Sequence, residues 1–295
     1  MNYLAEYASF LSKSADLKTK IRVVFDASDG TAGLVLNELL PQIPQIEGVI
    51  INGEPNGDFP AHGPNPLGEG ALVDLRRVII QKEADLGAIF DGDADRVLFL
   101  DEQGALLDSF ETFRLIKDRF EGPFVVDVRA LARFSMPDIP VVESKAGRLF
   151  IWEAMRRAEA ALGVERTGHF FFKEYRYFDS AILASIHLMN VVSELKTKGQ
   201  RVFEAVKKMP KLEYPPEINF KVTNPVECIA KVKAKFSGGD YELFELDGVS
   251  VYGKDFAFNL RLSSTEPLVR LNLAARKKDT LEQKLAEIKE VLEVK

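Results

Sequence analysis

The sequence predicts two consecutive three-layer α/β domains followed by a C-terminal α+β domain. Strand-like and helix-like segments alternate through residues 21–120, which predicts a parallel sheet there, and a second alternation occupies residues 121–212. After the adjacent prolines Pro215 and Pro216, the order changes to strand, helix, several strands and a final helix, which is typical of an antiparallel sheet. The predicted organisation is an entry helix at 1–20, α/β domains at 21–120 and 121–212, and an α+β domain at 213–295.

Composition indicates an ordinary globular protein with an acidic balance. Hydrophobic residues make up 46% and charged residues 28% of the 295 positions, and the formal net charge is −6. Since no block of Lys and Arg stands out, a nucleic-acid partner is not expected. Cys228 is the only cysteine, which excludes an internal disulfide and fits a reducing compartment. With no signal peptide and no apolar run of about 20 residues, the sequence predicts a cytoplasmic protein without a membrane partner.

In the first α/β domain, apolar periodicity and turn residues place the elements. We expect helices over 1–20, from the turn Asp26–Gly33 to Leu40, and over Glu69–Lys82. We expect strands at Ile21–Phe25, Gly48–Ile51, Asp85–Phe90 and Val97–Leu100. That turn either holds a phosphate at a helix N-terminus or uses glycine only for a tight connection. Residues 54–66 predict an ordered irregular loop, whose His62 either touches a ligand or is simply solvated or packed.

The remaining elements follow from the same patterns. A helix at Ser109–Phe120 is expected to end the first α/β domain. In the second α/β domain we expect strands at Phe124–Val128 and Ile139–Glu143. They are followed by helices at Arg148–Ala161, Asp179–Leu195 and Arg201–Lys208. In the last domain we expect a strand at Ile218–Val222, a helix at Pro225–Phe236, several strands and a helix at Thr280–Leu292.

The most informative stretch is Asp91-Gly92-Asp93-Ala94-Asp95-Arg96, between two strand-like apolar runs. Three carboxylates at alternate positions are costly to bury unpaired, and the small spacers let the backbone turn all three toward one centre. A hard cation such as Mg²⁺ prefers oxygen ligands, and Arg96 supplies a planar donor for a phosphate beside it.

Two alternatives to a metal loop are a solvated acidic turn and a calcium-binding EF-hand loop. The EF-hand pattern needs a glycine where Arg96 stands and helices on both sides, where this sequence has strand-like runs. The tight apolar flanks place the run at the end of a buried strand, where α/β proteins bind their ligands. The sequence therefore favours a Mg²⁺–phosphate loop.

Two further polar stretches are candidates for ligand contact. Residues 165–172 begin with Glu165-Arg166-Thr167-Gly168-His169, which in isolation is an ordinary polar turn. Residues 261–267 read Arg-Leu-Ser-Ser-Thr-Glu-Pro, and the guanidinium and three hydroxyls can cradle a phosphate. The alternative for this second stretch is a Ser/Thr-rich hairpin turn with a salt-bridged arginine.

The stretches GEPNGDFPAHGPNP (53–66) and ADLGAIFDGDADRVLFLDEQG (84–104) resemble the second domain of the phosphohexomutases, the phosphomannomutase/phosphoglucomutase superfamily. The resemblance implies two α/β/α phosphohexomutase domains, the family's α+β C-terminal domain, Mg²⁺ as cofactor and a hexose phosphate as substrate. It makes Asp91, Asp93 and Asp95 the metal ligands, with a phosphoserine from another domain as the fourth.

The resemblance also implies roles for residues in the other motifs. Glu165 and Thr167 match the Glu and Ser of the family's Gly-Glu-x-Ser-Gly-His loop, which contacts the sugar hydroxyls. His169 is implied to assist proton transfer, and Arg96 to be a catalytic charge beside the metal. Residues 261–267 match the family's phosphate loop, Arg-x-Ser-Asn-Thr-Glu-Pro, with Ser264 in place of the usual Asn. The match implies that four residues bind the substrate: Arg261, Ser263, Ser264 and Thr265.

Two features depart from the family pattern. Phosphohexomutases have four domains, and these residues correspond to the second, third and fourth; the serine loop, Thr-x-Ser-His-Asn-Pro, does not occur in the sequence. The family segment Gly-His-x-x-Ile-Lys reads Gly147 to Trp152 here, with Arg148 at the His position and Trp152 at the Lys position. An indole cannot transfer a proton at neutral pH, so the acid/base candidate is replaced.

These features favour a phosphohexomutase-like protein that has no mutase turnover as an isolated chain. The alternatives are a non-catalytic hexose-phosphate-binding or scaffold protein, and one half of a split mutase. Absence of the first domain would expose apolar area near Met1–Leu17, which predicts self-association or a partner chain there. Glucose, mannose and amino sugars all stay open as the hexose, because Glu165 and Thr167 suit several hydroxyl patterns.

Overall fold

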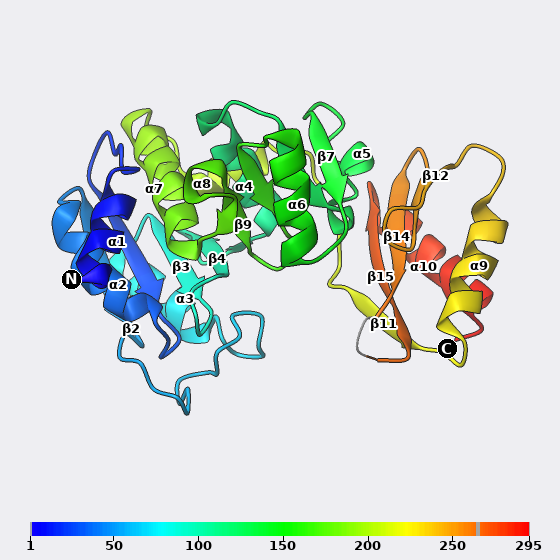
Figure 1. Cartoon of the computed structure of the whole chain (residues 1–295), viewed down its shortest axis with the longest axis horizontal. Helices are drawn as coiled ribbons and strands as arrows, with labels where there is room; N and C mark the ends of the chain where they lie inside the picture. The colour runs from blue at the N-terminus through cyan, green and yellow to red at the C-terminus, as the bar shows by residue number, and fades with distance from the viewer. Residues whose placement is uncertain (1, 264–265, 295) are drawn as a thin grey trace. The chain divides into compact units, whose positions relative to one another are not determined.

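A computed structural model of the protein describes residues 2–263 and 266–294. The chain forms two compact units, one of residues 1–122 and 161–209 and one of residues 123–160 and 210–295; Figure 1 shows their elements. Within the described residues, no helix has the length and apolar character of a membrane span. The predicted domain boundaries stay a prediction.

The first unit contains a five-stranded sheet with the order β2-β1-β3-β4-β5. Its strands are β1 (Ile21–Asp26), β2 (Ile46–Ile51), β3 (Leu86–Phe90), β4 (Val97–Asp101) and β5 (Leu106–Leu107). β1 is parallel to β2 and β3, whereas β4 is antiparallel to both β3 and β5. The prediction of a parallel sheet is therefore wrong for β4 and β5. Only the loop 91–96 joins β3 to β4, and a parallel crossover needs a dozen or more residues.

Helices cover both faces of this sheet. They are α1 (Tyr3–Ser12), α2 (Ala32–Leu39), α3 (Val73–Lys82), α4 (Ser109–Ile116), α7 (Ala181–Thr197) and α8 (Val202–Lys207), with short 3₁₀ helices η1 (Leu40–Gln42), η2 (Lys117–Arg119) and η4 (Lys173–Tyr175). α3 packs on β1 and β3, where Leu75 and Ile79 join Val24 and Ile89 in one core cluster. α7 packs on β1, β3 and β4, and Figure 1 shows it on the other side of the sheet from α3.

The entry helix is shorter than the predicted 1–20. α1 ends at Ser12, and the chain then turns before β1 begins. In this turn the backbone N–H of Asp16 donates to Asn190 Oδ1 of α7 at 2.7 Å. The N–H groups of residues 13–15 still donate to carbonyl oxygens of α1, but that of Asp16 donates to α7, so the helix does not continue toward β1.

Three short strands of the first unit carry the second candidate loop. β8 (Leu162–Val164) pairs antiparallel with β9 (Phe170–Phe172), which pairs antiparallel with β10 (Phe178–Asp179). All three phenylalanines of β9 are fully buried. Residues 165–169 therefore form the turn of a hairpin whose base is fixed by packed aromatic side chains.

The second unit begins with an α/β segment. It consists of β6 (Phe124–Asp127), η3 (Val128–Ala130), α5 (Ala132–Ser135), β7 (Val141–Ser144) and α6 (Arg148–Ala158). β6 and β7 are parallel. The sequence did not predict α5, since a single helical turn is too short to show a periodic pattern.

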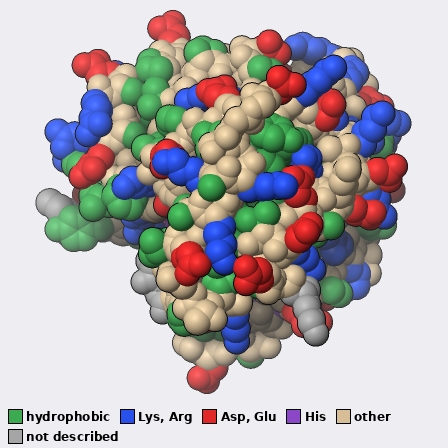
Figure 2. Space-filling model, turned by 90° about the vertical axis from the view of Figure 1, so that its right-hand side faces the viewer, with side chains coloured by type: hydrophobic (Ala, Val, Ile, Leu, Met, Phe, Trp, Pro, Cys, Tyr) green, Lys and Arg blue, Asp and Glu red, His purple; other side chains and the backbone are tan. Residues whose placement is uncertain are grey.

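The rest of the second unit is an antiparallel sheet with two helices. The strand order is β11-β15-β14-β13-β12, and the elements are β11 (Ile218–Lys221), α9 (Pro225–Phe236), β12 (Glu242–Phe244), β13 (Val249–Tyr252), β14 (Phe256–Leu262), β15 (Leu268–Ala275) and α10 (Lys278–Leu292). Phe236, Phe258 and Ile288 lie in the core between sheet and helices. Figure 2 shows acidic and basic side chains interspersed over the face viewed there. The predicted α+β pattern is confirmed.

Candidate functional site

The acidic run connects β3 to β4 and brings its three carboxylates together. One oxygen from each of Asp91, Asp93 and Asp95 lies within 4.8 Å of the others. Asp91 is buried, Asp95 is half-buried and Asp93 is exposed. Ala94 takes the left-handed conformation (φ 60°), which tightens the turn. Oxygen atoms that converge in this way suit a hard divalent cation such as Mg²⁺.

Arg96 folds back on this metal loop (residues 91–96). Its Nε donates to Asp91 Oδ2 at 2.6 Å, while the backbone N–H groups of Asp95 and Arg96 both donate to Asp91 Oδ1 at 3.0 Å. The Asp91 carboxylate therefore closes the loop, and its Oδ2, which accepts one hydrogen bond, has a second lone-pair direction for a cation. The guanidinium offsets part of the charge of the three carboxylates.

The structure places the candidate sugar loop (residues 165–169) against the metal loop. The N–H of Val97 donates to the carbonyl oxygen of Gly168 at 3.1 Å, which ties the two backbones together. His169 Nε2 lies 3.3 Å from Asp95 Oδ1, and His169 Nδ1 lies 3.1 Å from Glu165 Oε2. One imidazole therefore links a predicted metal ligand to a predicted sugar ligand.

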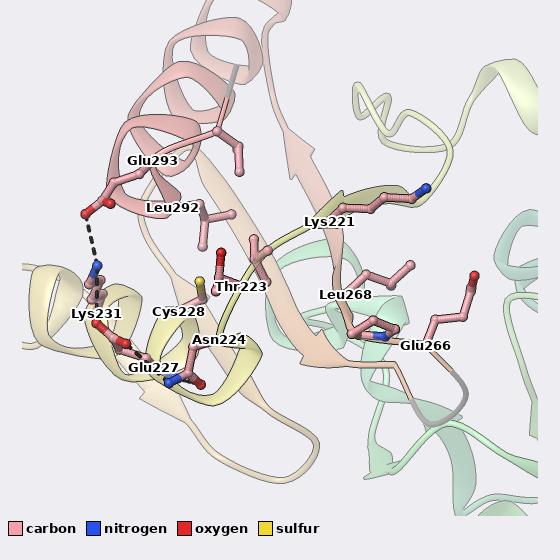
Figure 3. Close-up of a pocket in the computed structure, with 13 residues that line it drawn as sticks. Lys221, Thr223, Asn224, Glu227, Cys228, Lys231, Glu266, Leu268, Leu292 and Glu293 are labelled. Carbon is pink, nitrogen blue, oxygen red and sulfur yellow. Dashed lines mark hydrogen bonds and ion pairs between the residues drawn. The ribbon is translucent and has the colours of Figure 1, made fainter.

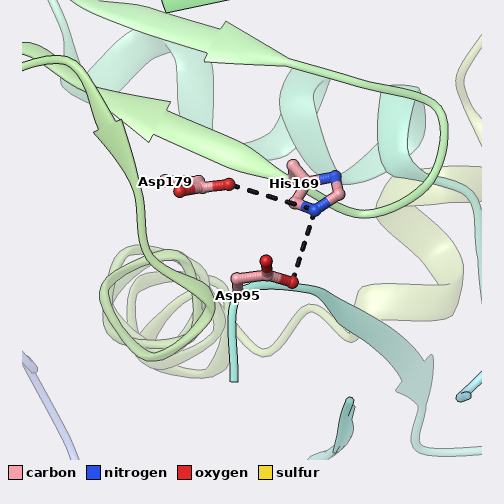
Figure 4. Close-up of side chains that lie close together, drawn as sticks. All are labelled: Asp95, His169 and Asp179. Atoms are coloured by element: carbon pink, nitrogen blue, oxygen red, sulfur yellow. Dashed lines mark ion pairs between the residues drawn. The ribbon is translucent and has the colours of Figure 1, made fainter. Parts of the chain in front are cut away.

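Two more side chains surround this imidazole. Thr167 Oγ1 lies 3.3 Å from His169 Nδ1, on the side of Glu165. Asp179 Oδ2 lies 3.9 Å from His169 Nε2, and Figure 4 shows it facing the ring together with Asp95. Sequence reasoning missed Asp179, because only the pairing of β9 with β10 brings it beside the hairpin turn.

The turn after β1 does not leave its amides available to a phosphate. The N–H groups of residues 28 to 31 donate in turn to Asp26 Oδ1 and to the carbonyl oxygens of Asn52, Ala27 and Gly92. Burial raises the pKa of the Asp26 carboxyl, against the hydrogen bonds that it accepts. Of the two roles predicted for this turn, the geometry favours the strand-to-helix connection.

The candidate phosphate loop lies in the second unit between β14 and β15. Ser264 and Thr265 lie outside the described residues. Arg261 Nη2 donates to Glu217 Oε2 at 3.0 Å, and Arg270 Nη1 donates to Glu217 Oε1 at 3.2 Å. Two guanidinium groups therefore converge on one carboxylate.

Glu217 and Arg270 were not among the predicted site residues. Arg270 is the register partner of Arg261 across the β14–β15 ladder, and its Nη2 donates to Ser263 Oγ at 3.2 Å. Burial opposes ionisation of Glu217, but the charge of Arg261 and a hydrogen bond from Asn272 outweigh it and hold the pKa of this carboxyl below its ordinary value. Arg270 can be recognised as a site residue only from the register of β14 against β15, which a single sequence does not show.

The two residues that depart from the family pattern both lie on α6. Arg148 is its first residue, after Gly147 with a φ of 127°. Trp152 is half-buried, and the Arg156 guanidinium carbon lies 4.6 Å from the centre of its ring. The indole therefore packs under a cation and places no ammonium group at the position of the family's lysine.

A separate pocket of about 780 Å³ lies in the second unit, beside the start of α9 and the end of α10 (Figure 3). Its Lys231 Nζ lies 2.9 Å from Glu293 Oε1 and 3.4 Å from Glu227 Oε1. The charge of Lys231 is therefore neutralised by its neighbours. None of the predicted site residues that the structure describes lines this pocket.

Known proteins resemble the chain along most of its length. Residues 1–104 match the family description "Phosphoglucomutase/phosphomannomutase, alpha/beta/alpha domain II". Residues 130–212 match alpha/beta/alpha domain III of the same family, and residues 217–291 match its C-terminal domain. The predicted fold class and the predicted resemblance are both confirmed by these matches.

Relatives and solved structures agree with the family matches. The chain is 33% identical to a phosphomannomutase of Methanocaldococcus jannaschii, over 99% of this chain and 66% of that protein. It is 32% identical to a phosphomannomutase of Escherichia coli, over 88% of this chain and 59% of that protein. A phosphoglucomutase/phosphomannomutase family protein from Burkholderia thailandensis has a similar fold, with a TM-score of 0.86 at 24% identity over 98% of this chain and 64% of that one.

A more distant solved structure contains ligands. It is the N-acetylphosphoglucosamine mutase of Aspergillus fumigatus in complex with GlcNAc-6P and magnesium, with a TM-score of 0.62 at 16% identity over 98% of this chain and 64% of that one. The chain spans 59–66% of the length of the two phosphomannomutases named above. By its three domain matches and these relatives, the chain belongs to the phosphoglucomutase/phosphomannomutase family.

Proposed function

We propose that this chain binds a hexose phosphate together with Mg²⁺ and contributes its metal, sugar and phosphate loops to a phosphohexomutase reaction. The observation that carries this proposal is the position of His169, within 3.3 Å of Asp95 and 3.1 Å of Glu165. A ligand held by the sugar loop lies beside the metal loop, as transfer of a phosphoryl group to a sugar hydroxyl requires.

Each predicted site residue has a role in this proposal. Asp91, Asp93 and Asp95 hold Mg²⁺, which when bound neutralises charge on a phosphoryl oxygen. Glu165 accepts hydrogen bonds from ring hydroxyls, and the hydroxyl of Thr167 adds a neutral contact. His169 assists transfer of the proton of the reacting hydroxyl, and Arg96 offsets the charge of the phosphoryl group. The distal phosphate is bound by the loop residues Arg261, Ser263, Ser264 and Thr265.

The phosphoserine of the reaction comes from outside these residues in our proposal. No Thr-x-Ser-His-Asn-Pro loop occurs among residues 1–295. We therefore expect the 295-residue polypeptide to bind its ligand without turnover. Calorimetry with glucose 6-phosphate, mannose 6-phosphate and N-acetylglucosamine 6-phosphate, with and without Mg²⁺, tests the binding. We expect heat of binding with at least one sugar and tighter binding with Mg²⁺; no binding of any of them would overturn the proposal.

A second candidate is a non-catalytic hexose-phosphate-binding protein. Trp152 favours it, because this residue stands where the family has an acid/base candidate. To separate the candidates, a serine-bearing first domain of a relative is added as a separate polypeptide with glucose 1-phosphate, glucose 1,6-bisphosphate and Mg²⁺. Formation of glucose 6-phosphate favours the split mutase. No turnover with either the natural chain or Trp152→Lys, while binding persists, favours the binding protein.

Self-association near the start of the chain is a further part of the proposal. Tyr3 on α1 and Leu34 on α2 are exposed apolar side chains there, 73% and 45% accessible. Such side chains favour association when they form part of a larger apolar patch. Sedimentation velocity at high protein concentration tests it, and a strictly monomeric species would contradict it.

A further inference from the structure

The metal loop is held from two sides by other loops of the first unit. The N–H of Thr31, in the turn after β1, donates to the carbonyl oxygen of Gly92 at 3.0 Å. The N–H of Gly92 donates to the carbonyl oxygen of Pro64, in the long loop after β2, at 3.1 Å. Ser28 Oγ also donates to the carbonyl oxygen of Phe90 at 2.6 Å. The backbone on both sides of the first carboxylate is therefore fixed by these two loops.

The fit between the loops is close. A Cβ atom on Gly30 would lie 2.5 Å from the carbonyl oxygen of Gly92, closer than real Cβ atoms come to other atoms. A Cβ atom on Gly92 would lie 3.1 Å from the ring of Phe59, which belongs to the long loop. Because the backbones touch, a shift of either supporting loop displaces the metal loop.

A buried contact between a histidine and a carboxylate joins the two supporting loops to each other. His62 Nε2 lies 3.2 Å from Asp26 Oδ2, and the two side chains are 7% and 0% exposed. The other oxygen of Asp26 accepts hydrogen bonds from the N–H of Ser28 at 3.0 Å and from Asn52 Nδ2 at 2.9 Å. A carboxylate this deeply buried depends on all of its partners. The N–H of Ala61 also ties the long loop to Asp29 Oδ2 at 2.9 Å, so removal of His62 weakens one of several attachments of this loop.

We propose that His62 is a positioning residue for the metal loop. Its contact with Asp26 fixes the long loop, Pro64 of that loop holds Gly92, and Gly92 sets the direction of the carboxylates beside it. Outer partners of this kind commonly change metal affinity without touching the metal. The inference rests on the proposed Mg²⁺ site, and it assigns the positioning of that site to a residue 29 positions before Asp91.

His187 offers a matched control. Its own side chain is also buried, at 9% exposed, and its Nε2 lies 2.8 Å from Oε1 of Glu174, whose side chain is 44% exposed. Its carboxylate partner belongs to η4, between β9 and β10, and not to the loops that hold Gly92. Loss of either histidine removes a buried imidazole, but only loss of His62 weakens the support of the metal loop.

The test compares His62→Ala, His62→Gln and His187→Ala in the full 295-residue chain. Hydrogen–deuterium exchange of the peptide over residues 88–96 is measured without metal, and Mg²⁺ affinity is measured by calorimetry. We expect His62→Ala to speed the exchange and to weaken Mg²⁺ binding by about tenfold each. His62→Gln restores both, since its amide nitrogen takes the place of Nε2. His187→Ala leaves the exchange rate and the Mg²⁺ affinity unchanged, even if it lowers the melting temperature as much as His62→Ala does.

Two outcomes would overturn the inference. One is unchanged exchange over residues 88–96 in His62→Ala. The other is an equal change in His187→Ala, which would indicate general destabilisation. If the unmodified chain does not bind Mg²⁺, the proposed metal site fails, while the exchange measurement still decides the role of His62.

Discussion

The metal loop of the first unit and the phosphate loop of the second unit are built with opposite charges. The metal loop collects three carboxylates around one guanidinium, that of Arg96. The phosphate loop collects the guanidinium groups of Arg261 and Arg270 around one carboxylate, that of Glu217. In both, a single opposite charge of the chain itself lies among the like charges that, in our proposal, face the ligand. The comparison indicates that each loop is organised before its ligand arrives.

The two opposite charges differ in how firmly they are held. Arg96 makes its close ion pair with one carboxylate, at 2.6 Å, and lies 3.9 Å from another. Glu217 accepts hydrogen bonds from three side chains, those of Arg261, Arg270 and Asn272. In our proposal Arg96 turns toward the phosphate beside the metal, whereas Glu217 keeps its two guanidinium groups in place for the distal phosphate.

Removal of one like charge from the metal loop is expected to have the largest effect. Asp93 is exposed, so Asp93→Asn keeps the fold while it deletes a charged ligand. We expect Mg²⁺ affinity to fall by about 100-fold or more, measured by calorimetry. Asp118→Asn is the control, because that carboxylate is 81% exposed on η2 and paired with Lys117. Equal affinities for the two variants would show that Asp93 is not a metal ligand.

Removal of the single opposite charge from the phosphate loop is expected to act on stability. Glu217→Gln leaves Arg261 and Arg270 facing each other across the β14–β15 ladder without a carboxylate. We expect the free energy of unfolding to fall by about 2 kcal/mol in urea denaturation. The matched change is Glu227→Gln, whose carboxylate is 56% exposed and pairs with Lys231, and which should cost no more than about 0.5 kcal/mol. Similar losses in both variants would contradict a special role for Glu217.

Local patterns in the sequence were enough to find both loops. The metal loop lies between two buried five-residue strands, β3 and β4, whose apolar character made its place at the end of a buried strand readable from residues 85–100 alone. The helix 1–20 was predicted too long because its end depends on Asn190, which a local pattern does not contain. The antiparallel β4 was also readable in principle, since six residues cannot form a parallel crossover.

What the sequence did not reveal were contacts between segments far apart in the chain. The approach of His169 to Asp95 joins two hairpin-like turns 74 positions apart. The same is true of Arg270 and Glu217, and of His62, whose burial against Asp26 depends on how a proline-rich loop folds back. Side-chain chemistry is readable from a single sequence, but the pairing of distant loops is set by tertiary packing.

Acid is expected to act through two carboxyl groups, Glu217 and Asp26, with opposite sign. The pKa of Glu217 is lowered in the folded chain, so this group stabilises the fold above its unfolded pKa of about 4.3, and the contribution is lost as pH falls through the folded value. The pKa of Asp26 is raised, chiefly by burial, so its protonation as pH falls favours the fold. Carbon-13 NMR titration of the two carboxyls checks both directions. Glu217→Gln should also show a shallower loss of stability below about pH 4.3 than the unmodified chain.

The smallest expected effect comes from a neutral group, and it measures how much of the site depends on charge. Thr167→Val keeps the shape of the side chain but removes the hydroxyl next to His169, whereas Thr167→Ser keeps the hydroxyl. A neutral hydrogen bond contributes about 0.5–1.5 kcal/mol, so we expect Val to weaken hexose-phosphate binding by about threefold to tenfold and Ser to leave it nearly unchanged. Calorimetry with the tightest-binding hexose phosphate gives the comparison. Thr167→Val could instead lower hexose-phosphate affinity by as large a factor as Asp93→Asn lowers Mg²⁺ affinity. Neutral contacts of the sugar loop would then determine binding as strongly as the charges of the metal loop do. In that case the contrast in charge between the metal loop and the phosphate loop explains the stability of these loops but not their affinity for ligands.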